Sequence, residues 1–117
     1  MASVLKIELP WPHSALSPNG RPHYYTKAAQ TKKHVKLAWG AAKEQLPPCF
    51  KHNGERITVR LTFHPKPKGP EPDKDNCIAS CKAYLDGLAM ALGVNDSLFD
   101  IAAPVIAERG SKVVIEI

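Results

Sequence analysis

The alternation between residues 57 and 63 constrains the fold most. In Ile57-Thr58-Val59-Arg60-Leu61-Thr62-Phe63, apolar side chains occupy every second position. Because successive side chains of a β-strand point to opposite faces, this pattern predicts a strand with one buried face. A shorter alternation puts Leu5, Ile7 and Leu9 on one side of a second strand, over residues 4–9. A sheet of this kind needs a covering layer over its apolar face.

Two stretches with helical periodicity supply that layer. The first predicts a helix from the N-cap Thr26 to about Leu46, where Pro47-Pro48 stops it. The second predicts one helix from about Asp75 to Leu92. The expected buried stripes are Val35, Ala38, Trp39 and Ala42 in the first helix, and Ile78, Cys81, Leu85, Leu88 and Leu92 in the second.

The end of the chain returns to strands, over residues 98–107 and 112–117. Pro104 has no N–H for a ladder, so the former strand is expected at an edge or with a bulge. Pro and Gly density predicts irregular loops over residues 10–25 and 64–72. The order β-α-β-α-β-β predicts one α+β domain over residues 1–117. Its mixed sheet would have about four strands, with two helices packed on it.

Composition limits the cellular setting. The chain of 117 residues has no apolar run near the roughly 20 residues of a membrane span, and its start lacks the features of a signal peptide. A cytoplasmic protein without membrane contact is the expectation. Cys49, Cys77 and Cys81 form no disulfide framework and lack two further ligands for zinc, so they are interpreted as buried apolar residues.

Charge is divided unevenly along the chain. The net charge is +5, and no acidic residue occurs between Leu9 and Lys43. Such a segment is either a solvated lysine face or a surface that follows phosphates. The aromatic residues Trp11, Tyr24 and Tyr25 could likewise stack on bases or pack over the edge of the core. The candidate DNA-binding lysines are Lys27, Lys32, Lys33, Lys36, Lys66 and Lys68.

Acidic residues gather instead around the start and end of the second helix. Asp73 and Asp75 precede Asn76 at its start, and Asp96 lies in the turn after it. Each could be a cap or turn residue. Together, as ligands with only oxygen donors, they suit Mg²⁺ or Mn²⁺ rather than zinc. At such a site Lys82 would neutralise charge on a scissile phosphate.

Four stretches carry a more specific pattern: Ile7-Glu8-Leu9-Pro10-Trp11-Pro12-His13-Ser14, Asp73-Lys74-Asp75-Asn76, Lys82-Ala83-Tyr84-Leu85-Asp86-Gly87-Leu88 and Gly93-Val94-Asn95-Asp96-Ser97. With the order of elements, they resemble the RusA family of Holliday-junction resolvases. The resemblance implies a homodimeric, Mg²⁺-dependent endonuclease, bacterial or phage-encoded, that nicks four-way DNA junctions symmetrically. It also implies that Asp73, Asp75 and Asp96 are metal ligands and that Lys82 is the catalytic lysine.

One departure from the family pattern concerns that lysine. The family commonly has it three residues after the Asn, where this chain has Ala79. Lys82 comes one helical turn later, on roughly the same face of a continuous helix but about 4.5 Å further along its axis. Two alternatives stay open: a DNA-binding module in which the aspartates only cap, and a nuclease that cuts flaps or other branched DNA.

Overall fold

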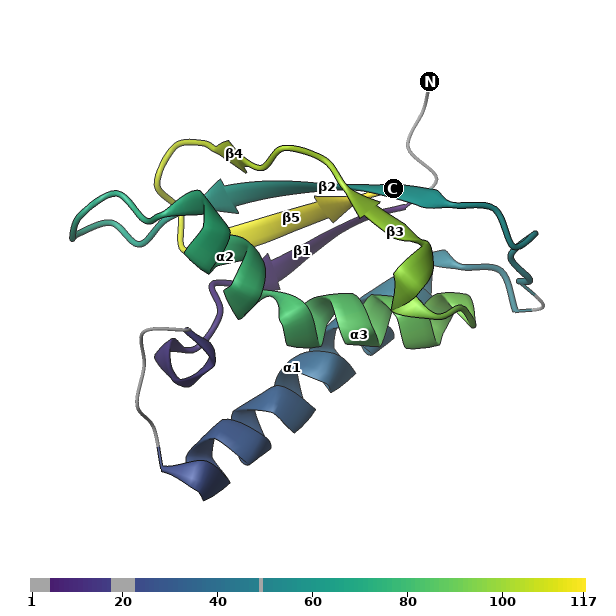
Figure 1. Ribbon diagram of the computed structural model, residues 1–117, viewed down its shortest axis with the longest axis horizontal. Helices are drawn as coiled ribbons and strands as arrows, with labels where there is room; N and C mark the ends of the chain where they lie inside the picture. The colour runs from purple at the N-terminus through teal and green to yellow at the C-terminus, as the bar shows by residue number, and fades with distance from the viewer. Residues whose placement is uncertain (1–4, 18–22, 49) are drawn as a thin grey trace.

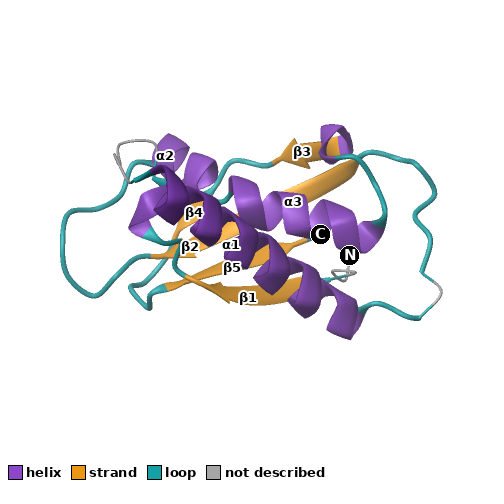
Figure 2. Ribbon diagram, turned by 90° about the horizontal axis from the view of Figure 1, so that it is seen from below, coloured by secondary structure: helices purple, strands orange, loops and turns teal. Residues whose placement is uncertain are grey.

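A mixed sheet of five strands forms one layer of the fold, and three α-helices lie over one of its faces (Figure 1). These counts refer to residues 5–17, 23–48 and 50–117, which the computed structural model describes. Figure 2 shows the helices crossing the sheet. The layered α+β architecture expected from the sequence is therefore confirmed.

The central strand is β2 (Ile57–His64), and its alternation behaves as expected. Ile57, Val59, Leu61 and Phe63 are all buried. The strand order is β1-β5-β2-β3, with β4 also paired to β2. Both β1 (Lys6–Pro10) and β2 run antiparallel to β5 (Lys112–Glu116), so Ile115 faces Ile7 on one side and Leu61 on the other.

The strand expected over residues 98–107 is divided in two. β3 (Phe99–Ile101) and β4 (Val105–Ile106) each pair with β2 in parallel, at different positions along it. Ala102 still donates to the Val59 carbonyl, but the interruption includes Pro104, which has no N–H to continue the ladder. The mixed sheet is confirmed, and this interruption gives it five strands rather than about four.

The first helix, α1 (Tyr24–Gln45), starts before its expected N-cap. His23 takes the cap position, with its Nδ1 accepting the Tyr25 N–H at 3.3 Å, and Thr26 lies inside the helix. The Thr26 cap was wrong because a histidine ring supplies the acceptor that Ser, Thr, Asp or Asn usually provides.

The buried stripe of α1 also differs from expectation. His34, Ala38 and Ala42 are buried, whereas Val35 is only partly buried and Trp39 is exposed. The helix lies against α3 closely enough that small residues occupy the contact. A tryptophan has no room there, so the expectation for Trp39 was wrong.

The single helix expected from about Asp75 to Leu92 is two helices. α2 (Lys74–Ser80) and α3 (Lys82–Leu92) are separated by Cys81, whose φ and ψ are −93° and 5°. Cys81 N–H bonds to the Ile78 carbonyl, a tight closure of three residues, and the Ser80 hydroxyl donates to the Asn76 carbonyl. The continuous helix was therefore wrong, although most of its apolar residues are buried as expected.

The core lies between the sheet and the helices. Its largest fully buried side chains include Tyr84 and Leu88 from α3 and Phe63 from β2. Among the described residues, no helix is long and apolar enough to cross a membrane.

Candidate functional site

Lys82 lies between two carboxylates. Its Nζ is 2.6 Å from Asp96 Oδ2 and 3.0 Å from Asp86 Oδ1. Asp86 is one turn further along α3, and Asp96 begins a short 3₁₀ turn, η2 (Asp96–Leu98), whose first N–H groups are capped by Asn95. The structure thus brings together two of the four expected catalytic residues, Lys82 and Asp96.

The charges in this cluster stabilise one another. The hydrogen bonds that Lys82 donates, first to Asp96 and second to Asp86, raise its pKa. The hydrogen bond from Lys82 lowers the pKa of Asp96. Lys82 is therefore a cation and Asp96 a carboxylate at neutral pH. Asp86 also belongs to this cluster, although it was not assigned a role in the site. Its spacing of four residues from Lys82 is the sequence signal that could have indicated it.

Asp73 and Asp75 lie at the start of α2. Asp73 Oδ1 accepts the N–H groups of Asp75 at 2.9 Å and of Asn76 at 3.1 Å, so Asp73 is the N-cap of the helix. Asp75 lies in the first turn, where a carboxylate also meets the positive end of the helix dipole. One continuous helix carrying both Asp75 and Lys82 was expected from the sequence. Because of the break at Cys81, the two residues lie on different helices.

The three aspartates have the donor chemistry of a magnesium site, but they are not assembled as one. In the part of the chain that the structure describes, no three His, Cys, Asp or Glu side chains are grouped in a way that could hold a metal ion. Mg²⁺ in proteins is commonly bound by one or two carboxylates, with waters and substrate phosphates completing its shell. Binding in that mode would need only one or two of these carboxylates.

Two adjoining hollows connect these elements. The first, of about 380 Å³, lies between the segment after β1 and the start of α2, and its lining includes Lys66, Asp73 and Asn76. The second, of about 280 Å³, is lined by Lys27, Lys82 and Asp86 among others. Both include Ser17 and Ser80 in their linings, so the two hollows adjoin, and together they are here called the site groove.

Some of the candidate DNA-binding lysines line the site groove and others do not. Lys27 and Lys66 line it. Lys32, Lys33 and Lys36 surround a different hollow, with Ala29 and Leu37 of α1. Lys68 is exposed in the loop before α2. Lys66 shares its hollow with Asp73, and Lys27 shares its hollow with Lys82 and Asp86, whereas Asp75 and Asp96 line neither.

The loop that carries Lys66 is fixed by an arginine that the sequence analysis did not single out. Arg109 donates from Nη1 to the Lys66 carbonyl at 2.7 Å and from Nη2 to the Gly69 carbonyl at 2.9 Å. The following residues, Gly110 and Ser111, donate backbone N–H groups to the Pro65 carbonyl. No local pattern signals this clamp, because Arg109 and Lys66 are far apart in the sequence.

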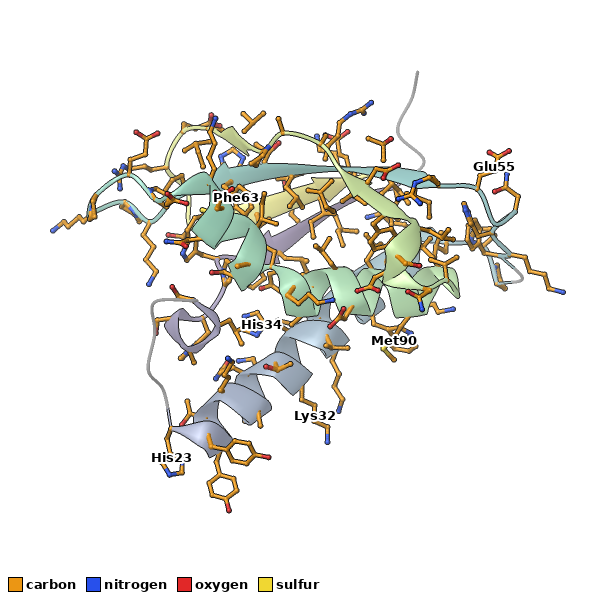
Figure 3. The ribbon with its side chains drawn as sticks, viewed as in Figure 1. His23, Lys32, His34, Glu55, Phe63 and Met90 are labelled. Carbon is orange, nitrogen blue, oxygen red and sulfur yellow. The ribbon has the colours of Figure 1, made fainter. Side chains whose placement is uncertain are left out.

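The opposite wall of the groove is fixed by Tyr84 and His34. Tyr84 donates its hydroxyl to the Pro10 carbonyl at 2.7 Å, and His34 Nε2 accepts the His13 N–H at 3.2 Å. His34 Nδ1 donates to the Gln30 carbonyl, and its ring stacks on Tyr84 with centroids 4.9 Å apart. His34 is labelled in Figure 3. Burial is the main cause that lowers its pKa, which keeps the ring neutral and able to accept from His13.

Comparison with known proteins gives one informative relative. No family model matches the chain. A protein of Xylella fastidiosa (strain Temecula1), described as uncharacterized, is 36% identical to it over 118 residues, which cover 93% of this chain and 72% of that protein.

Proposed function

We propose that this chain, which belongs to the same family as the Xylella fastidiosa protein, is a Mg²⁺-dependent endonuclease that resolves four-way DNA junctions. The observation that carries the proposal is the position of Lys82, held between Asp86 and Asp96 where it lines the site groove. The likeness of the surrounding residues to the RusA family, given above from the sequence, supports the same function.

Lys82 is suited to stabilise negative charge on a phosphate. Its two carboxylate partners accept hydrogen bonds from the ammonium group and favour its charged form. A DNA strand in the groove would meet Lys82 and Lys27 at one hollow and Lys66 at the other. Fixed cations aimed at a phosphate whose charge grows during cleavage lower the barrier more than mobile ones do.

Asp73, Asp75 and Asp96 are the residues that would hold Mg²⁺. When bound, the ion would lower the pKa of a water and stabilise the leaving oxygen of the phosphodiester. The substrate phosphate is proposed to supply part of the coordination shell, in keeping with carboxylates that are not grouped beforehand. Paired nicks on opposite strands need two such sites, so a homodimer is part of the proposal, as is a cytoplasmic location.

A DNA-binding module without catalysis is the second candidate. The N-cap role of Asp73 favours it, because capping alone is reason enough for a carboxylate at that position. In this alternative the lysines bind DNA, and the ion pairs of Lys82 only join α3 to η2.

The test is cleavage of a labelled synthetic four-way junction with and without Mg²⁺. Wild type and Asp75→Asn are compared, with linear duplex and flap DNA as competitors. Asp100→Asn is the matched control, because Asp100 is an exposed acid paired with Arg56 away from the groove. Paired nicks near the crossover that vanish in Asp75→Asn and without metal would support the resolvase.

Other outcomes correct or overturn the proposal. Tight junction binding without cleavage under Mg²⁺ or Mn²⁺ would favour the binding module. Equal cutting of flaps would keep the chemistry and change the substrate. Loss of cleavage in Asp100→Asn as well would mean that the effect is not specific to the site.

A further inference from the structure

The outer end of α1 carries a cluster of exposed aromatic rings. Tyr24 and Tyr25 are 76% and 73% exposed. The ring of Tyr25 stacks on His23, with centroids 5.3 Å apart and planes at 24°, and meets Tyr24 edge to face at the same distance. Figure 3 shows His23 at the tip of α1, away from the sheet. These three residues are here called the aromatic tip.

The aromatic tip is not part of the core. Trp11, the other aromatic residue considered for base stacking, packs its edge on Phe63 with centroids 6.1 Å apart and joins the core. Trp11 and the two tyrosines therefore have different surroundings. Trp11 packs over the edge of the core, whereas Tyr24 and Tyr25 contact each other and solvent.

Positive charge adjoins the aromatic tip. Tyr24, Lys27 and Lys32 line a shallow hollow of about 420 Å³, with Ala28 and Thr31 between them. The first turn of α1 contains no acidic residue, and no described acidic side chain forms an ion pair with Lys27 or Lys32. Figure 3 shows Lys32 directed away from the body of the molecule. A ligand with flat faces and negative charge is complementary to this surface.

We propose that the aromatic tip binds a nucleotide whose base face is exposed at the branch of the DNA substrate. A base would stack on Tyr24 or Tyr25, and Lys27 and Lys32 would contact its phosphates. Bases inside a duplex already stack on their neighbours, so only branch points and single strands offer a free face. This inference rests on the proposed function for the identity of the DNA.

Lys27 links the aromatic tip to the site groove. It lines the hollow beside Tyr24 and also the hollow that contains Lys82 and Asp86. A strand whose exposed base is held at the tip would therefore pass its backbone along Lys27 toward Lys82. The aromatic tip is thus a device for selecting a branched substrate, whereas Lys82 and the aspartates belong to cleavage.

The experiment uses 2-aminopurine, whose fluorescence is quenched when it stacks. The probe is placed at the crossover of a four-way junction and, separately, in a single-stranded oligonucleotide. The full-length protein is titrated into each, in the absence of divalent metal so that no DNA is cut. A covalently closed circular duplex, which has neither ends nor loops, is the reference without free base faces.

The variant Tyr24→Ala/Tyr25→Ala is expected to lose the quenching and to bind junction and single strand about tenfold more weakly. Its affinity for the closed duplex should change less than twofold. Tyr24→Phe/Tyr25→Phe keeps the rings and should bind like wild type. Met90→Ala removes another exposed apolar side chain, on α3, and should have no effect. Circular dichroism confirms that each variant folds.

Two results would overturn the inference. One is wild-type quenching and affinity in the alanine variant. The other is loss of binding in the phenylalanine variant, which would mean that the hydroxyl groups rather than the ring faces are needed. If wild type stacks the probe but never cuts, the nuclease proposal fails and the inference stands. If wild type cuts junctions while the alanine variant binds normally, the nuclease proposal stands and the inference about the aromatic tip fails.

Discussion

Lys82 Nζ lies 2.6 Å from Asp96 Oδ2, which joins the first residue of α3 to the turn that follows the same helix. The contact is possible because Gly93, with φ of 71°, ends the helix in the left-handed region that favours glycine. Asn95 then caps η2, so that Asp96 is turned back toward Lys82. The ion pair between Lys82 and Asp96 depends on this local geometry, and substitutions can test it directly.

Replacing Lys82 should separate cleavage from binding. Lys82→Met is expected to reduce junction nicking by about 100-fold or more, because it removes the cation proposed to stabilise the phosphate charge. Junction affinity should fall only a few-fold, since other lysines still contact the backbone. Lys51→Met, at an exposed lysine outside the groove and not among the candidate DNA-binding lysines, should leave nicking unchanged. Cleavage at the wild-type rate in Lys82→Met would contradict the role assigned to this residue.

The ionisation of Asp96 gives a test that does not depend on activity. Lys82 lowers the pKa of Asp96, so its carboxyl should titrate below the usual aspartate range, as followed by carbon NMR. In Lys82→Met the titration should move up toward that range. Since the folded pKa is the lower one, the pair favours the native state above the ordinary aspartate pKa. That contribution is lost as the pH falls through the folded value. An unchanged titration in the variant would show that the contact is absent in solution.

Gly87 sets how closely α1 and α3 approach. A methyl group there would collide with the Val35 carbonyl oxygen and lie 3.0 Å from Ala38 Cβ. Gly87→Ala should therefore destabilise the fold by about 1–3 kcal/mol, measured by urea unfolding. Gly40, in the middle of α1, has open space around it, and Gly40→Ala should stabilise by about 0.5–1 kcal/mol. Equal effects of the two substitutions on the free energy of unfolding would mean that α1 and α3 do not approach each other this closely at Gly87.

Sequence patterns were sufficient to predict the buried face of β2 but not the buried face of α1. The alternation of β2 depends only on neighbouring residues, so residues 57–63 were predicted correctly. Which face of α1 is buried depends on Gly87, far along the chain, and this is why His34 rather than Trp39 lies inside. A pattern of apolar residues within one helix carries no information about the shape of its partner.

The candidate site likewise has some features that were expected from the sequence and others that were not. Lys82 and Asp96 were named as candidate site residues from their motifs, and the structure shows them in contact, although their roles stay predictions. The break at Cys81 was not foreseen, because helical periodicity continues across it in the sequence. The Arg109 clamp on the Lys66 loop joins residues more than 40 positions apart, which no local spacing indicates.

The buried His34 should make the fold sensitive to acid. Its folded pKa is lowered, mainly by burial and further by the nearby charges of His13 and Lys33. The unfolded chain therefore binds the proton more readily. The stabilising effect of neutral His34 is complete above about pH 6.5 and falls as the pH decreases toward the folded value. Urea unfolding between pH 5 and 8 should show this slope, and His34→Gln should make it shallower. An identical slope in both proteins would contradict the assignment.

Asp73 can be tested for two functions with two substitutions. Asparagine caps helices about as well as aspartate, so Asp73→Asn should keep the stability of α2, whereas Asp73→Ala should lose about 1 kcal/mol of unfolding free energy. If Asp73 also holds Mg²⁺, both variants should lose junction cleavage, because neither keeps the carboxylate. If Asp73 only caps, Asp73→Asn should cleave like wild type. Parallel urea unfolding and Mg²⁺-dependent nicking assays on the two variants distinguish these results. A fully active Asp73→Asn would remove this residue from the proposed metal ligands and leave the cap as its function.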